Sequence, residues 1–172
     1  MKMKIVLVSL ALVLLLSLSA SAALETNAGT AEKLMLESSR FTFGLGMAGN
    51  PFLGVVTKNG FGYPVSEAGL SNWLGFSYTW ISGQPTQAEI EEAVKTIVAK
   101  YGDRVFLPQE LATEVRSLIN KNQLTYFTFG TVGLIFPLNI EGGWMWLASD
   151  NIRFRFGLGL PLLVAFGINF DF

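Results

Sequence analysis

Charged side chains within the strand-like parts of the chain are the first candidates for chemistry. Arg40, Glu141, Arg153, Arg155 and Asp171 alternate with large apolar residues, so they share a strand face with glycine, threonine and asparagine. Arginines and carboxylates on one face can form ion pairs, or can line a narrow path for ions. Because charges removed from water have to pair, we expect an internal network of ion pairs, with an arginine-lined pore as the alternative.

The side chains on which most covalent and acid–base mechanisms depend are missing. The sequence contains no histidine and no cysteine, so it has no imidazole base, no thiol nucleophile and no disulfide. The sequences Gly44-Leu45-Gly46 and Gly157-Leu158-Gly159 lie inside predicted strands rather than before a helix, which argues against phosphate-binding loops. We therefore expect no enzymatic activity, no cofactor and no metal site.

The first 22 residues are typical of a cleaved secretory signal. Lys2 and Lys4 precede an apolar run of about 14 residues, shorter than the roughly 20 that span a bilayer. The small residues that follow predict cleavage after Ala22. The rest of the chain has ten basic and thirteen acidic residues without a positive cluster, so nucleic acid is not an expected partner.

A two-residue period dominates most of the remaining chain. In residues 41–47, 152–160 and 164–172, large apolar side chains alternate with small or polar ones, which is typical of strands between two different environments. Apolar residues make up 51% of the chain, yet no later segment has 18 consecutive ones, so a helical membrane protein is excluded. Strands of a membrane barrel show only every second side chain to lipid, which accounts for both observations.

The period changes to 3.6 between residues 83 and 122. Thr86 with Glu89 predicts a capping box, Gly102 marks the end of a helix, and Pro108 is placed to open a second one. We expect a helical hairpin inserted into an all-strand chain. Its apolar stripes either satisfy each other and cap the barrel, or dock a periplasmic partner protein.

Residues 38–82 and 123–172 have room for eight strands of about 12 residues each, turns included. Bacterial single-chain barrels have an even number of strands, and Asn59-Gly60 predicts a two-residue hairpin turn. Residues 23–37 are polar and weakly patterned, and we expect them to form a periplasmic leader segment. The predicted strands are 38–48, 52–58, 61–66, 70–82, 123–136, 138–148, 151–160 and 162–172.

An up-and-down arrangement with both ends in the periplasm places the helical hairpin on the periplasmic side. The same arrangement brings aromatic residues together near that end, as in the girdles that barrels have at the membrane interface. The predicted girdle consists of Phe41, Tyr78, Trp80, Trp144 and Trp146.

The last strand resembles the C-terminal signature of bacterial outer-membrane barrels. Gly167-Ile168-Asn169-Phe170-Asp171-Phe172 matches the pattern Gly-x-x-aromatic-x-aromatic. The resemblance implies that Gly167, Phe170 and Phe172 are read by the barrel-assembly machinery. The whole arrangement resembles the small eight-stranded outer-membrane barrels, which implies an antiparallel, up-and-down transmembrane β-barrel in contact with membrane lipid. The helical insertion departs from that class, so no specific function is carried over.

Three hypotheses about function follow. The first is an integral outer-membrane barrel with a structural or partner-binding role, its lumen filled by side chains. The second is a narrow pore for small solutes or ions. The third is a soluble periplasmic barrel that binds a hydrophobic ligand.

Overall fold

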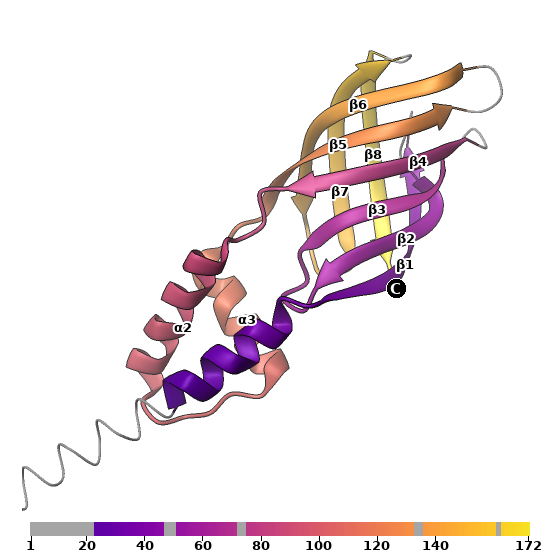
Figure 1. Cartoon of the computed structure of the whole chain (residues 1–172). Coiled ribbons are helices and arrows are strands. Elements are labelled where there is room, and N and C mark those ends of the chain that lie inside the picture. Colours follow the sequence, from indigo (N-terminus) through magenta and orange to yellow (C-terminus); the bar gives the residue numbers. More distant parts are fainter. Residues whose placement is uncertain (1–22, 47–50, 72–74, 133–135, 161–162) are drawn as a thin grey trace, which may run out of the picture. The chain divides into compact units, whose positions relative to one another are not determined.

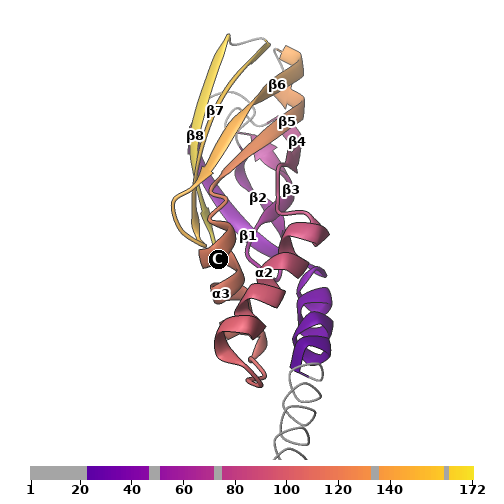
Figure 2. The same ribbon diagram turned by 90° about the vertical axis from the view of Figure 1, so that its left-hand side faces the viewer.

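The computed structural model describes residues 23–46, 51–71, 75–132, 136–160 and 163–172. Eight antiparallel strands form a closed barrel in which each strand pairs with its neighbours in the sequence and β8 pairs with β1 (Figures 1 and 2). The predicted eight-stranded, antiparallel, up-and-down barrel is therefore confirmed. The strands are β1 (Glu37–Gly46), β2 (Pro51–Asn59), β3 (Pro64–Ser71), β4 (Phe76–Ser82), β5 (Gln123–Val132), β6 (Phe136–Leu147), β7 (Ile152–Leu160) and β8 (Val164–Asp171).

The two ends of the barrel differ in what they carry. β1 begins and β8 ends at the same end, where the chain also connects β2 to β3, β4 to β5 and β6 to β7. We call this the turn end; the helices inserted between β4 and β5 are attached here. The opposite end, where β1 joins β2, β3 joins β4, β5 joins β6 and β7 joins β8, is the loop end.

The second hairpin differs from its prediction. The predicted two-residue turn at Asn59-Gly60 is wrong, because β2 continues through Asn59 and β3 begins only at Pro64. The Asn59 carbonyl accepts a hydrogen bond from the Gly62 amide at 2.9 Å, and the Asn59 Oδ1 accepts one from the Tyr63 amide at 3.0 Å. An asparagine side chain that bonds to the backbone favours a turn. Gly62, with φ of 82°, is the residue that takes the left-handed conformation.

This difference changes which residues belong to the third and fourth strands. The predicted third strand ended at residue 66 and the predicted fourth began at 70, whereas β3 runs to Ser71 and β4 begins at Phe76. Glu67, which the prediction left in a loop, therefore lies inside β3 and points into the barrel.

The inserted helices form a compact unit of their own, made of residues 23–34 and 86–119. The predicted helices are confirmed as α2 (Gln87–Tyr101) and α3 (Pro108–Ile119). The capping box is formed, because Glu89 accepts a hydrogen bond from the Thr86 amide at 2.7 Å and the Thr86 side chain accepts one from the Glu89 amide. None of the helices in the described ranges is long and apolar enough to cross a membrane.

Within the predicted periplasmic leader segment at 23–37, residues 23–34 form a third helix, which the sequence analysis did not predict. Its buried positions Ala23, Asn27 and Ala31 are four residues apart but small or polar, so they produce no apolar stripe in the sequence. The Asn27 side chain donates a hydrogen bond to the Arg104 carbonyl and accepts one from the Phe106 amide, both at 3.0 Å. This buried asparagine fixes the third helix to the segment between α2 and α3.

Replacing Asn27 with alanine is expected to destabilise the helical unit by about 1–3 kcal/mol. The change leaves the Phe106 amide without its buried acceptor, which costs the full desolvation of that group. Hydrogen exchange of the full chain should show faster exchange in residues 86–119 and unchanged protection in the strands. Equal loss of protection in the barrel would contradict the assignment of Asn27 to the helical unit alone.

Candidate functional site

The interior of the barrel is organised around Arg153, whose side chain is fully buried. Its Nε and Nη2 donate to the two carboxylate oxygens of Asp171 at 2.9 and 2.7 Å. Its Nη2 and Nη1 donate to the two oxygens of Glu67 at 3.1 and 3.3 Å. Arg153 thus makes two bidentate contacts, the strongest arrangement available to a guanidinium group with carboxylates.

A second arginine, Arg155, extends the contacts toward β5 and β6. Its Nη2 donates to the Thr128 hydroxyl at 2.7 Å and to Glu141 at 3.3 Å, and its Nη1 lies 3.8 Å from Glu67. The guanidinium carbon lies 4.2 Å from the centre of the Tyr126 ring, and the Tyr126 hydroxyl is hydrogen-bonded to Glu141. The aromatic ring therefore adds a cation–π contact to the ion pair.

Lys58 completes the cluster near the turn end. Its Nζ lies 2.5 Å from Asp171 and also donates to the carbonyl of Asp150 in the connection between β6 and β7. Three cations thus meet three carboxylates, and the cluster is neutral as a whole. We call these six residues the lumen network: Lys58, Glu67, Glu141, Arg153, Arg155 and Asp171.

Hydrogen-bonded partners extend the lumen network to every wall of the barrel. Its own members come from β2, β3, β6, β7 and β8. Thr42 of β1 accepts from Arg153 at 3.2 Å, and Thr128 of β5 lies 2.7 Å from Thr79 of β4. All eight strands are therefore tied to one polar cluster, and no member of the network is more than 2% exposed.

Four of the five interior charges named from the sequence, Glu141, Arg153, Arg155 and Asp171, lie in the lumen network. Placing Arg40 among them was wrong, because its side chain is exposed. Pairing between β1 and β8 begins only at Thr42, so Arg40 precedes the part of β1 that is enclosed on both sides.

Sequence reasoning missed three interior residues: Lys58, Glu67 and Tyr126. The sequence pattern did contain a signal, because each of these residues lies an even number of positions from a buried residue of the same strand and therefore shares its face. Lys58, for example, lies two positions from Val56. The predicted strand limits left Glu67 in a loop, and the sequence analysis singled out neither Lys58 nor Tyr126.

Apolar side chains fill the interior beside the lumen network, since Val56 pairs with Glu67 and Leu147 pairs with Arg153. Val56, Ile81, Leu124 and Leu147 are all buried on the inward faces of their strands. Phe61 and Tyr63, from the connection between β2 and β3, are at most 2% exposed. Among the described residues, the interior therefore consists of charged and apolar side chains packed next to each other, as expected for eight strands.

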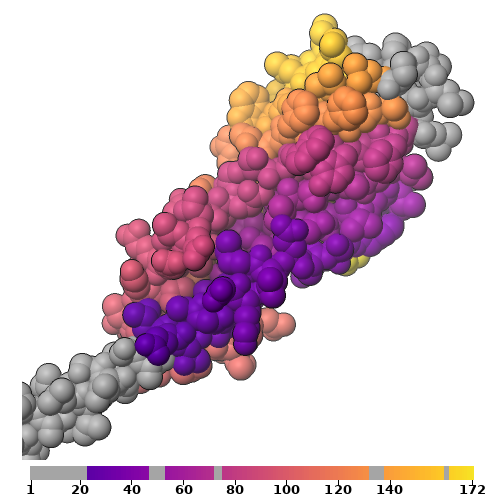
Figure 3. All heavy atoms as spheres, in the orientation of Figure 1, coloured from indigo at the N-terminus to yellow at the C-terminus, as the bar shows by residue number. Residues whose placement is uncertain are grey.

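The outer surface of the barrel, in contrast to the lumen network, is apolar and almost without charge. Among the outward-facing positions of the described strands, Glu37, the first residue of β1, is the only charged one. In Figure 3 the side chains of β2 to β5 form a continuous surface on one wall of the barrel. Exposed apolar residues come from every strand and include Phe41, Leu45, Leu53, Val55, Leu70, Phe76, Trp80, Phe127, Phe129, Leu138, Trp144, Trp146, Phe154, Phe156, Leu158, Leu160, Val164 and Phe166. We call this surface the outer band.

All five residues of the predicted aromatic girdle lie on the outer band. Phe41, Trp80, Trp144 and Trp146 occupy the turn-end halves of β1, β4 and β6. Tyr78 lies two positions nearer the loop end, and its ring centre is 4.6 Å from that of Trp80.

The three residues of the predicted assembly signal lie along the strand that closes the barrel. Gly167 is buried opposite Gly46 of β1, and Phe170 faces outward opposite Phe43. The Phe172 amide donates to the Phe41 carbonyl at 2.9 Å, and its side chain is exposed.

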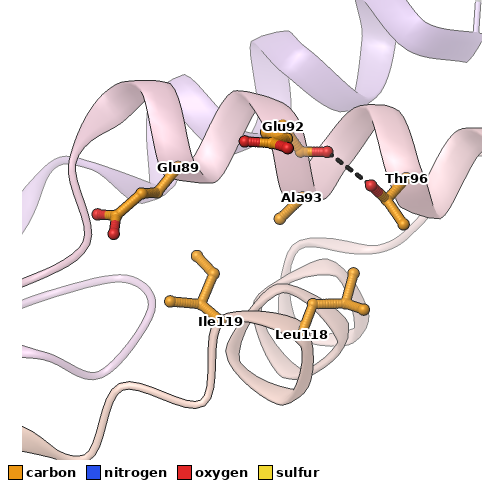
Figure 4. A pocket seen from close by; sticks show the side chains of 6 residues that line it. All are labelled: Glu89, Glu92, Ala93, Thr96, Leu118 and Ile119. Carbon is orange, nitrogen blue, oxygen red and sulfur yellow. Dashed lines mark hydrogen bonds between the residues drawn. The ribbon is translucent and has the colours of Figure 1, made fainter.

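A shallow groove of about 300 Å³ lies between α2 and α3 in the helical unit (Figure 4). Ala93, Leu118 and Ile119 provide an apolar floor, and Glu89 and Glu92 lie on the α2 side. Leu118 is half exposed. The groove has the chemistry to hold an apolar side chain flanked by basic groups.

Charge is unevenly divided between the two units. Residues 23–34 and 86–119 carry eight acidic and five basic side chains, whereas residues 35–85 and 120–172 carry five of each. The helical unit is therefore acidic and the barrel neutral.

No family model matches the chain, and neither a curated protein nor a solved structure is significantly similar to it.

Proposed function

We propose that the chain is an integral outer-membrane β-barrel protein with a structural or partner-binding role, in which a non-conducting barrel anchors the acidic helical unit at the periplasmic surface. The observation that carries the proposal is the inverted distribution of side chains. Charges are enclosed in the lumen network, while the outer band is apolar and, beyond Glu37, uncharged.

The apolar outer band is unfavourable in contact with water. Contiguous exposed apolar patches on soluble monomers rarely exceed a few hundred Å², and here large apolar residues are exposed on all eight strands. In hydrocarbon the same residues can stay exposed without another protein surface packing against them. The closed barrel also leaves no strand edge with unpaired backbone groups. The tryptophans at the turn-end side of the band match the preference of aromatic rings for a membrane interface.

The filled interior supports a structural role over the pore. An ion crossing the lumen network would have to separate Arg153 from Glu67 and Asp171, which hold it by four hydrogen bonds. It would also meet the buried apolar side chains of Val56, Ile81, Leu124 and Leu147. The same packed side chains occupy the space that a hydrophobic ligand would need.

The helical unit supports the partner-binding role. Its acidic character and the groove next to Glu92 suit a partner segment that presents an apolar side chain between basic ones. This partner would reach the unit from the periplasm, because α2 and α3 are attached at the turn end.

Extraction experiments test the membrane assignment. The full chain should stay in the membrane fraction after alkaline carbonate washing and dissolve only in detergent. Unheated samples should migrate differently from boiled ones on electrophoresis in sodium dodecyl sulfate, since closed barrels resist unfolding by that detergent. Release by carbonate alone would refute the proposal.

Planar-bilayer recordings distinguish the structural role from the pore. The purified full chain is expected to insert without producing discrete conductance steps, because packed side chains block the lumen. A variant with Arg153→Ala and Arg155→Ala is a useful comparison, since it removes two large charged side chains from the lumen while the buried apolar side chains remain. Stable single-channel conductance of the unmodified chain would favour the pore.

A further inference from the structure

Three uncharged side chains inside the barrel are buried with unused hydrogen-bonding capacity. In the part of the chain that the structure describes, the Ser77 hydroxyl, both polar atoms of the Asn139 side chain and the Asn169 Oδ1 have no hydrogen-bond partner. Each of the three residues is at most 1% exposed. A buried polar atom without a partner costs the desolvation of that group, so protein interiors satisfy nearly all such atoms through the chain or through ordered water.

Strand pairing places Ser77 and Asn139 on either side of a glycine. Ser77 of β4 pairs with Gly130 of β5, and Gly130 pairs with Asn139 of β6. The two polar residues are therefore separated by two strand spacings, about 10 Å. Gly130 has no side chain to fill the space between them, and a Cβ at this position would lie 2.1 Å from the Phe76 carbonyl oxygen. The inner surface here consists of two polar side chains with bare backbone between them.

Other inward-facing positions on the same side of the lumen network are also glycine. They follow members of the network or their partners along the strands toward the loop end and include Gly44, Gly54, Gly69, Gly130, Gly159 and Gly167. Asn169 lies within this surface, because it pairs with Gly44 of β1 and is two residues from Gly167. The interior of an eight-stranded barrel is just wide enough for its own side chains, so inward glycines leave room for molecules as small as water beside the polar atoms.

The chemistry of these polar atoms limits what can bind beside them. The Asn139 Nδ2 donates and its Oδ1 accepts, the Ser77 hydroxyl does both, and the Asn169 Oδ1 accepts. A ligand therefore has to donate and accept hydrogen bonds within one small volume. An uncharged ligand fits, because the adjoining lumen network already balances three cations with three carboxylates. Water meets all of these conditions.

We propose that ordered water molecules bridge the Ser77 hydroxyl and the Asn139 side chain across Gly130, and that water also binds the Asn169 Oδ1. The barrel interior is then hydrated on the loop-end side of the lumen network, next to the packed charged and apolar side chains. The water links β4 to β6, which are not neighbours in the barrel, by hydrogen bonds that strand pairing does not provide. The inference concerns the inside of the barrel and does not rest on the membrane assignment.

Water-selective nuclear magnetic resonance of the full chain in detergent micelles tests the proposal. Bound water gives cross-relaxation peaks of opposite sign in nuclear Overhauser and rotating-frame spectra, and we expect such peaks at the side-chain amide protons of Asn139. Asn27 is the matched control, because it is equally buried but binds the chain with both its amide nitrogen and its oxygen. Its side-chain amide should show water peaks at least fivefold weaker.

Two results of this experiment would overturn the inference. Water peaks of equal strength at Asn139 and Asn27 would show that the Asn139 side chain has no specific hydration. An Asn139 amide that contacts only protein protons would show that another part of the chain satisfies it, and the water site would not exist.

The variant Asn139→Leu provides an independent measurement. Leucine has nearly the shape of asparagine but makes no side-chain hydrogen bonds, so it removes the water contacts of the amide and leaves Ser77 without its bridge. The urea midpoint for unfolding of the barrel should therefore fall or stay unchanged. If the Asn139 amide instead has no partner at all, its removal relieves the cost of desolvation and raises the midpoint. A higher midpoint would therefore overturn the inference.

Discussion

Replacing Arg153 with methionine is expected to lower the free energy of unfolding of the barrel by about 3–5 kcal/mol. The change leaves the carboxylates of Glu67 and Asp171 buried, and among the described residues Lys58 and Arg155 are the cations that remain near them. Removing one partner from a buried ion pair costs this much because the remaining charge stays out of water without compensation. Urea unfolding in lipid vesicles, followed by tryptophan fluorescence, measures the loss.

Two further variants show whether the cost comes from charge. Adding Glu67→Gln to Arg153→Met restores a neutral network, and this double variant should recover at least half of the lost stability. Arg104→Met removes an exposed ion pair with Glu110 in the helical unit and should cost less than about 1 kcal/mol. If Arg153→Met were as mild as Arg104→Met, the lumen network would not be the element that holds the barrel walls together.

The second prediction with a large effect is that a charge placed on the outer band lowers the stability of the barrel. Phe156 lies in the middle of β7 between Trp144 and Phe166, and its side chain is exposed. If the outer band faces lipid as proposed, Phe156→Arg is expected to lower the stability of the barrel in a bilayer by about 2–4 kcal/mol, because the guanidinium group would have to enter hydrocarbon. The measurement is again urea unfolding in lipid vesicles.

The matched control for this effect is Ile152→Arg. Ile152 is the first residue of β7 at the turn end and faces the same side as Phe156, so its arginine can reach the interface at a cost of about 0–1 kcal/mol. A soluble barrel would show the opposite behaviour, since a new surface arginine at Phe156 would be neutral or would improve solubility. Equal, small effects at both positions would therefore contradict the membrane assignment.

Much of the architecture was readable from the sequence because local patterns determine it. The alternation around Phe154 and Phe156 assigned inward and outward faces correctly, since a strand has a side-chain period of two. The capping box of Thr86 and Glu89 located the start of α2, because such a cap satisfies backbone donors within four residues.

The errors arose where a residue depends on partners far away in the sequence. Glu67 was left in a loop by the predicted strand limits, and its partner Arg153 lies 86 residues away in the sequence. Asn27 looked like part of a polar leader, because its partners Arg104 and Phe106 are more than 75 residues away.

The sequence alone determined the eight alternating strands, the two inserted helices and the separation of apolar from polar faces. These features follow from short-range periodicity, which each segment carries by itself. The tertiary structure decided that the barrel closes through β1 and β8, which charges share the lumen network, and that Arg40 lies outside it. Those outcomes depend on register between strands that are up to 129 residues apart, as between Thr42 and Asp171, and no local pattern encodes such a distance.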